Sequence, residues 1–191
     1  MKTLLIALAL LAGIHQVAVQ AQNLYVSEPN NGNIISISPG GSQSTFASGL
    51  TYPAGLACNS AGDVFDADDF AIYGFTPGGV QSNFVASGLQ PIGLAFDRAG
   101  NLFESDFSGN IFKFTTNGVK STFASGLNIP RGLAFDSAGN LFEADGGTGN
   151  IYEFTTNGVQ STFSSAGLPG IICLAFDSAD NLFVSGNSSY I

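Results

Sequence analysis

One feature constrains this chain more than any other: a unit of about 40 residues recurs along its length after residue 21. The unit is clearest in PIGLAFDRAGNLFESDFSGNIFKFTTNGVKSTFASGL (91–127) and PRGLAFDSAGNLFEADGGTGNIYEFTTNGVQSTFSSAGL (130–168). Alignment of the units gives an equivalent position, 38 to 41 residues apart, to Leu24, Val64, Leu102, Leu141 and Leu182. A period of this length indicates a repeat architecture, in which each unit is one small structural module packed against the next.

Each unit divides into four short β segments, which we call a, b, c and d in chain order. GLAF, NLFEA, NIYEF and GVQSTF are rich in aromatic and β-branched residues, and turn residues separate them. Asn-Gly in TTNGV and Gly-Gly in TPGGV supply the positive φ that a tight hairpin needs. No segment after residue 21 has helical periodicity. The sequence therefore predicts an all-β fold of four-stranded antiparallel units.

The motif P-x-GLAFD-x-x-GNLFEAD, followed by GNI-x-x-F-T-x-x-G, resembles the NHL-repeat and SMP-30/gluconolactonase/LRE-like β-propellers. The resemblance covers nearly all of residues 22–191 and implies four-stranded blades around a central axis, typically six of them. The chain supplies segments b to d, then three complete units, then a and b, and it stops at the first residue of a c segment, Ile191. We therefore expect part of a six-bladed ring, incomplete at its C-terminal end; a small closed ring is the alternative.

Residues 1–21 have the three parts of a secretory signal. Lys2 precedes an apolar run over 4–12, and the small residues Val19 and Ala21 precede a cleavage position. The apolar run is too short to span a bilayer, and no Cys follows the cleavage position to carry a lipid. We expect an exported protein without a membrane anchor.

The charged residues exclude several kinds of function. Residues 22–191 carry four basic and fourteen acidic side chains, which argues against nucleic acid and anionic membranes as partners. His15 is the only histidine, so the predicted mature chain has no Ser-His-Asp triad and no imidazole base. Streptogramin lyases and peptidyl-hydroxyglycine lyases resemble this chain in fold but rely on histidine, so their chemistry does not carry over. The two cysteines, Cys58 and Cys173, occupy non-equivalent repeat positions, and we expect free thiols.

The acidic residues form two recurring sets. One set lies in the a–b turns, where the sequence predicts that the side chains cap the turn: Asp97, Asp136 and Asp177, with Asn59 in the same position. The second set ends segment b on the opposite face, as pairs spaced two apart: Asp66 and Asp68, Glu104 and Asp106, Glu143 and Asp145. In the first unit, Glu28 is alone.

Residues i and i+2 of a strand point to the same side, so each pair of the second set can present two carboxylates to a hard cation such as Ca²⁺. The SMP-30 resemblance implies a divalent metal held by carboxylate and Asn oxygens, although no residue here matches a specific ligand motif of that family. Recurrence in three units favours a structural role instead, in which the acids bind backbone N–H groups. Both interpretations stay open at this point, with the structural one preferred.

The regular units lack any irregular insertion, which favours a non-catalytic binding or scaffold module for a protein, carbohydrate or small-molecule ligand. The alternative function is a metal-dependent lactonase or related hydrolase that uses the b-segment carboxylates. Phe75, Phe114 and Phe154 recur once per unit, and we expect them to pack between neighbouring blades.

Overall fold

The structure is a computed structural model that describes residues 17–20, 23–85, 90–165, 167, 168 and 170–187. These residues form eighteen β-strands and no helix, so the predicted all-β class is confirmed. Among them, accordingly, no helix is long and apolar enough to cross a membrane. Most of the predicted signal segment, residues 1–16 and 21, lies outside the described residues, and its role as a signal stays a prediction.

The strands form four four-stranded sheets, which we number as blades 1 to 4, and one two-stranded sheet, blade 5. Blade 1 contains β1 (Val17–Gln20), β2 (Asn23–Glu28), β3 (Asn33–Ile37) and β4 (Gln43–Ser48). Blade 2 contains β5 (Leu56–Cys58), β6 (Val64–Asp68), β7 (Ala71–Phe75) and β8 (Gln81–Val85). Blade 3 contains β9 (Pro91–Phe96), β10 (Leu102–Asp106), β11 (Asn110–Phe114) and β12 (Lys120–Ser125). Blade 4 contains β13 (Pro130–Phe135), β14 (Leu141–Asp145), β15 (Asn150–Phe154) and β16 (Gln160–Ser164), and blade 5 contains β17 (Ile171–Phe176) and β18 (Leu182–Gly186).

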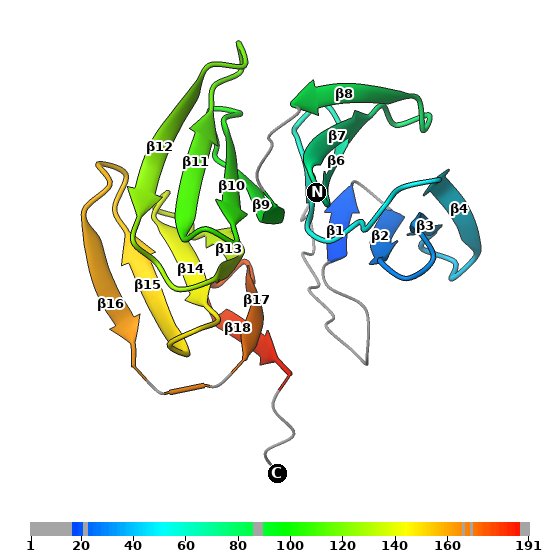
Figure 1. Cartoon of the computed structure of the whole chain (residues 1–191). Coiled ribbons are helices and arrows are strands. Elements are labelled where there is room, and N and C mark those ends of the chain that lie inside the picture. The colour runs from blue at the N-terminus through cyan, green and yellow to red at the C-terminus, as the bar shows by residue number, and fades with distance from the viewer. Residues whose placement is uncertain (1–16, 21–22, 86–89, 166, 169, 188–191) are drawn as a thin grey trace.

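The blades follow one another around an arc in chain order (Figure 1). Every sheet is an antiparallel meander, and its first strand lies beside the first strands of the neighbouring blades, in the order β1, β5, β9, β13, β17. These first strands, in segment a, are therefore the inner strands of the arc, and β4, β8, β12 and β16 are the outer strands. The repeat unit thus corresponds to one blade, as the sequence predicts.

Blade 1 differs from the prediction, which gives its unit only segments b, c and d. Val17–Gln20 pairs with β2 in antiparallel register, with Ala18 opposite Tyr25, and so occupies the inner position. This strand comes from the stretch predicted to be a signal. The sequence comparison missed it because VAVQ shares no motif with the GLAF segments of the other units.

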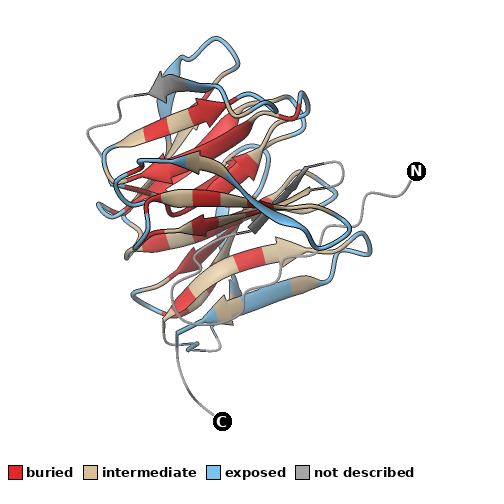
Figure 2. Cartoon of the chain, turned by 90° about the vertical axis from the view of Figure 1, so that its right-hand side faces the viewer, coloured by how far each residue is buried: buried red, intermediate tan, exposed pale blue. Residues whose placement is uncertain are grey.

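The core lies between blades rather than within them, since each sheet is only one layer thick. Phe75, Phe114 and Phe154, at the end of strand c, are each at most 2 % exposed and pack against the preceding blade. Phe154, for example, packs with Phe103 and Ile111 of blade 3. Burial of a Phe side chain stabilises the fold by about 2 to 3 kcal/mol. Buried segments fill the middle of the strands, and exposed segments lie mostly at the loops and outer strands (Figure 2). The predicted packing role of these phenylalanines is confirmed.

Glycines on the inner strands allow neighbouring blades to approach closely. A Cβ atom on Gly93 of β9 would lie 1.9 Å from the carbonyl oxygen of Arg131 in β13. A Cβ on Gly132 of β13 would lie 2.6 Å from the carbonyl oxygen of Ile172 in β17. Such distances are impossible for a real Cβ, so the GL dipeptide of the repeat is required by the spacing between the inner strands.

Candidate functional site

The six b-strand acids divide into two structural groups. We call Asp66, Glu104 and Glu143 the mid-strand acids, and Asp68, Asp106 and Asp145 the strand-end acids. All six are buried, with side-chain exposure between 0 and 3 %. The two groups nevertheless have different partners, and this difference decides what each can do.

The strand-end acids bind the backbone of the d–a loop that precedes the blade, of the b–c turn within it, or of both. The carboxylates accept N–H hydrogen bonds at 2.9 Å from Thr51, 2.8 Å from Asn110 and 2.7 Å from Asn128. Among the described residues, the backbone donors include Thr51, Tyr52 and Asp69 for Asp68, Asn110 for Asp106, and Asn128 and Thr148 for Asp145. These carboxylates therefore hold the d–a and b–c connections on the strand ends.

The mid-strand acids are buried without a hydrogen bond to any described residue. Neither carboxylate oxygen of Asp66, Glu104 or Glu143 has a hydrogen-bond partner in the part of the chain that the structure describes. Burial disfavours the charged form and is the largest contribution to the raised pKa values of these acids. The pKa is about 9 for Glu143 and about 7 for Glu104, and that of Asp66 is well above its usual range. The strand-end acid two residues on raises each pKa further.

Two of these acids lie beside a repeated contact between blades. Backbone N–H groups of Ala54 and Arg131 lower the pKa of Asp66 and Glu143, respectively, but less than burial raises it. The carbonyls of the same two residues accept hydrogen bonds from serine hydroxyls of the preceding blade, Ser27 at 2.8 Å and Ser105 at 2.6 Å. Each such interface thus combines a satisfied serine with a carboxyl whose pKa is raised by burial, and the value of about 9 for Glu143 keeps that carboxyl protonated at neutral pH.

The described residues do not gather these acids into a metal site. No three His, Cys, Asp or Glu side chains within them come close enough together to hold a metal ion. The strand-end carboxylates already accept backbone N–H groups, and the mid-strand acids lie on three separate blades. The residues present here therefore do not fit a divalent cation, and the cation site on the six acids stays a prediction without structural support in this part of the chain.

The acids of the a–b turns are turn caps, as the sequence predicts. Asp97, Asp136 and Asp177 each accept the backbone N–H of the Asn four residues on, at 2.8 to 2.9 Å, and also its side-chain amide. Asn59 makes the equivalent backbone contacts with Ala61 and Asp63. These bonds lower the pKa of the exposed Asp177.

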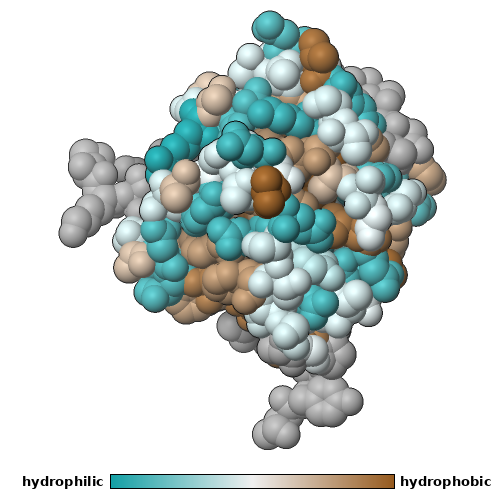
Figure 3. Space-filling model, turned by 90° about the vertical axis from the view of Figure 1, so that its left-hand side faces the viewer, coloured by the Kyte–Doolittle hydropathy of each residue, from teal (hydrophilic) through white to brown (hydrophobic). Residues whose placement is uncertain are grey.

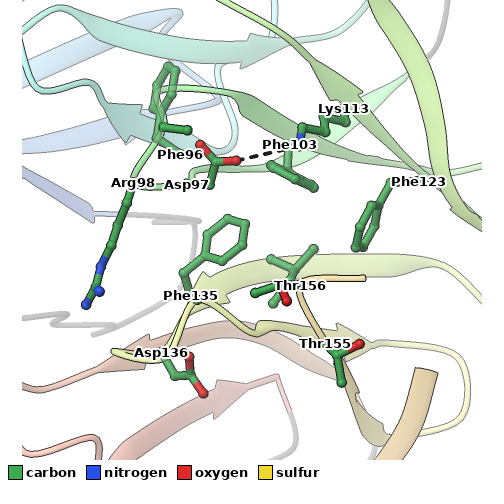
Figure 4. Close-up of a pocket in the computed structure, with 13 residues that line it drawn as sticks. Phe96, Asp97, Arg98, Phe103, Lys113, Phe123, Phe135, Asp136, Thr155 and Thr156 are labelled. Atoms are coloured by element: carbon green, nitrogen blue, oxygen red, sulfur yellow. Dashed lines mark ion pairs between the residues drawn. The ribbon is translucent and has the colours of Figure 1, made fainter. Parts of the chain in front are cut away.

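A cavity of about 400 Å³ opens between blades 3 and 4, on the face that carries these turns (Figure 4). Four aromatic rings contribute to its wall, and Phe103 contacts both Phe123 and Phe135 edge to face, with ring centroids 5.0 and 5.1 Å apart. Charged side chains of both signs also line it. The lining residues are Phe96, Asp97, Arg98, Ala99, Phe103, Lys113, Phe123, Phe135, Asp136, Gly139, Leu141, Thr155 and Thr156.

The cavity has an aromatic wall and a basic flank. The Lys113 ammonium lies 3.7 Å from Asp97 Oδ2 and 5.2 Å from the centroid of the Phe103 ring. Arg98 is exposed and makes no ion pair within the described residues. The sequence analysis missed this site because it followed recurring residues, whereas Arg98 and Lys113 occur at these repeat positions in blade 3 alone.

Outside this cavity, the side of the molecule formed by β12 and β16 shows apolar patches scattered among polar atoms (Figure 3). Exposed apolar side chains of the two blades include Val119, Val159 and Phe163. Single exposed apolar residues of this kind are ordinary on protein surfaces.

Comparison with solved structures places the architecture among known folds. A structure of a nidogen/laminin complex matches with a TM-score of 0.78 and 23 % identity, over 89 % of this chain and 70 % of that chain. A protein assigned as a gluconolactonase matches with a TM-score of 0.74 and 18 % identity, over 86 % of this chain and 68 % of that one. The chain has the β-propeller fold. A streptogramin B lyase is a further propeller neighbour, with a TM-score of 0.70 and 13 % identity, over 91 % of this chain and 68 % of that chain.

These propeller neighbours are SMP-30/gluconolactonase-like and NHL/YWTD proteins, so the predicted resemblance is confirmed at the level of the fold. The chain spans about 70 % of the propellers it matches, in agreement with the prediction that it forms part of a larger ring. No protein-family model matches the sequence, and no curated protein matches it either. Because the identities are low, the comparisons show the fold and leave the activity open.

Proposed function

We propose that this propeller is an exported, non-catalytic binding module and that the cavity between blades 3 and 4 is its ligand site. The supporting observation is local. The repeat is similar from blade to blade, yet on the wall of this cavity Arg98 replaces the serine that recurs at its position. Residues that build a blade recur in every blade, so a departure at a cavity favours a binding role.

The volume and lining of the cavity suit a small ligand. Sites for small molecules typically enclose about 300 to 1,000 Å³ and combine an apolar wall with a few polar groups. The rings of Phe103 and Phe135 supply apolar surface, while Thr156 and the two bases supply polar contacts. Protein and carbohydrate partners remain candidates for the loops on either face of the arc.

A metal-dependent lactonase is the second candidate function. Two observations favour it: the mid-strand acids are buried without hydrogen bonds, and one fold neighbour is assigned as a gluconolactonase. Against it stands the lack of any three clustered metal-ligating side chains within the described residues. In this function, the acids would need ligands from elsewhere in the ring.

Two measurements separate the functions. Calorimetric titration with Ca²⁺ and Zn²⁺, combined with an assay of lactone hydrolysis, tests the enzyme. We expect neither metal binding nor turnover, whereas metal-dependent turnover that is lost in Glu143→Gln and Asp145→Asn would overturn the proposal.

A nuclear magnetic resonance screen with uncharged aromatic fragments tests the cavity, and we expect shift changes at Phe123, Phe135 and Thr156. A screen with no binder at these residues would contradict the cavity assignment.

A further inference from the structure

The a–b turns of blades 4 and 5 are joined by a contact that has no equivalent among the described residues between blades 3 and 4. Between blades 4 and 5, the Ser137 N–H donates to Asp180 Oδ1 at 2.9 Å, and the Ser137 hydroxyl donates to Oδ2. This pair ties the a–b turn of blade 4 to that of blade 5. The residues at the same two repeat positions between blades 3 and 4 are Arg98 and Gly139, and both line the cavity. A glycine has no side chain to reach Arg98.

The cations at the cavity are specific to blade 3. Where blade 3 has Arg98, the other units have Ser60, Ser137 and Ser178. Lys113 faces Phe103 across the strand pair, and Glu153 occupies the same register position opposite Phe142 in blade 4. The Lys113 position differs in every blade, with Ser36, Gly74 and Glu153 as its equivalents, so Arg98 is the base that replaces a recurring residue, in a chain whose residues 22–191 carry four bases in all.

The acids at the cavity are already engaged, and one of them holds Lys113, which leaves Arg98 available. Asp97 and Asp136 each accept the N–H and the side-chain amide of an asparagine in their own turn. Asp97 also pairs with Lys113 at 3.7 Å, whereas Arg98 has no acidic partner within the described residues. A guanidinium in this state can form a bidentate, charge-assisted pair with a carboxylate.

We infer that the cavity binds a small aromatic carboxylate, with its ring among Phe103, Phe123 and Phe135 and its carboxylate on Arg98. Lys113, 5.2 Å from the Phe103 ring centroid, is paired with Asp97, so the anion binds Arg98 rather than Lys113. The inference rests on the proposed binding function and narrows it to one ligand class. Arg98 is then the residue that determines the preference for an anion, and the aromatic wall determines the preference for a planar ring.

The test uses 2-naphthoate as the probe and its uncharged analogue 2-naphthamide as the comparison. The chain has no Trp, so the naphthalene fluorescence can be followed without interference from tryptophan emission. We expect 2-naphthoate to bind more tightly than 2-naphthamide at low ionic strength, and the difference to shrink as salt screens the charge. Arg98→Ser, which restores the residue of the other repeats, is expected to weaken 2-naphthoate by about tenfold and to leave 2-naphthamide unchanged.

A matched control separates this site from a general charge effect. Lys120 is a base of the same blade, but its ammonium lies over Phe112, at 3.8 Å from the ring centroid, on strands β12 and β11 and away from the cavity wall. Lys120→Gln, which introduces the residue of blade 4, should leave 2-naphthoate binding within twofold. Equal weakening by Lys120→Gln and Arg98→Ser would show that net charge, not this cavity, governs binding.

A second variant closes the cavity by design. Gly139→Asp introduces the acid that blade 5 carries at this turn position. Gly139 and Asp180 both have a positive φ, so the backbone there accommodates an aspartate. We expect the new carboxylate to pair with Arg98 and to abolish 2-naphthoate binding, with folding checked by circular dichroism. Tighter binding of 2-naphthamide than of 2-naphthoate would overturn the anion assignment and leave the proposed binding function intact. Failure of both probes to bind would overturn both.

Discussion

Replacement of Glu143 by glutamine should change how the stability of the propeller depends on pH. Burial raises the pKa of this carboxyl from 4.5 to about 9. Over that interval the folded chain keeps a proton that the unfolded chain releases, so a rise in pH favours the unfolded state. The contribution of Glu143 is therefore fully present below pH 4.5 and is lost as the pH rises towards 9.

The size of the effect follows from the same shift. Each pH unit within the interval removes about 1.4 kcal/mol, so the change from pH 5 to pH 8 removes roughly 4 kcal/mol of unfolding free energy. That loss is a large part of the 5 to 15 kcal/mol that typically stabilises a domain. Glu143→Gln cannot ionise, and its unfolding free energy should decline less between pH 5 and pH 8 by about that amount.

The assay is urea unfolding at pH 5 and pH 8, followed by circular dichroism and by the fluorescence of the tyrosines. Glu153→Gln is the matched control, because it makes the same change on β15, the next strand of the same blade, at a partly exposed side chain. The control should keep the pH dependence of the unmodified chain. If Glu143→Gln also keeps that dependence, the carboxyl is ionised in the folded state and the argument from burial is wrong.

Three further predictions concern the interfaces and loops. Gly93→Ala should destabilise the fold by about 3 kcal/mol in urea unfolding, because its Cβ would overlap the Arg131 carbonyl, and an unchanged midpoint would contradict the close strand spacing. Asp145→Ala should cost about 2 kcal/mol, since it removes the carboxylate that accepts the Asn128 N–H, and hydrogen exchange should accelerate at that amide. Cys58, whose pKa burial raises to about 12, should react with iodoacetamide at pH 8 at least about a hundredfold more slowly than free cysteine, as mass spectrometry can measure.

Much of the fold could be predicted because the same pattern of strand and turn residues recurs in several units. The GL dipeptide marks the inner strand, where Gly93 allows close approach, and the Phe at the end of segment c marks the packing surface between blades. Turn chemistry is equally local, so the caps at Asp97 and Asp136 could be inferred from sequence alone. The inner strand of blade 1 could not, because Val17–Gln20 has no repeat motif and is recognised only by its pairing with β2.

The hydrogen-bond partners of the b-strand acids could not be predicted from the sequence. The alternation of strand side chains correctly predicts that Glu143 and Asp145 lie on one side of β14, but it does not predict their partners. Asp145 reaches the N–H groups of two loops, while Glu143 reaches none that makes a hydrogen bond. The two donors belong to the d–a loop and to the b–c turn, which meet at the end of β14, where Asp145 lies.

Recurrence alone therefore does not separate structure from function in this chain. The mid-strand acids recur in three blades, yet they are costly to bury, and a leucine in their place would remove that cost. Arg98 occurs in one blade at a position where the other units have serine, and in the same blade Lys113 pairs with Asp97 beside the Phe103 ring. Where one repeat differs from the others on the wall of a cavity, the residue there is not required for the blade to fold. The interface between blades 3 and 4 combines such a departure, Arg98, with a cavity.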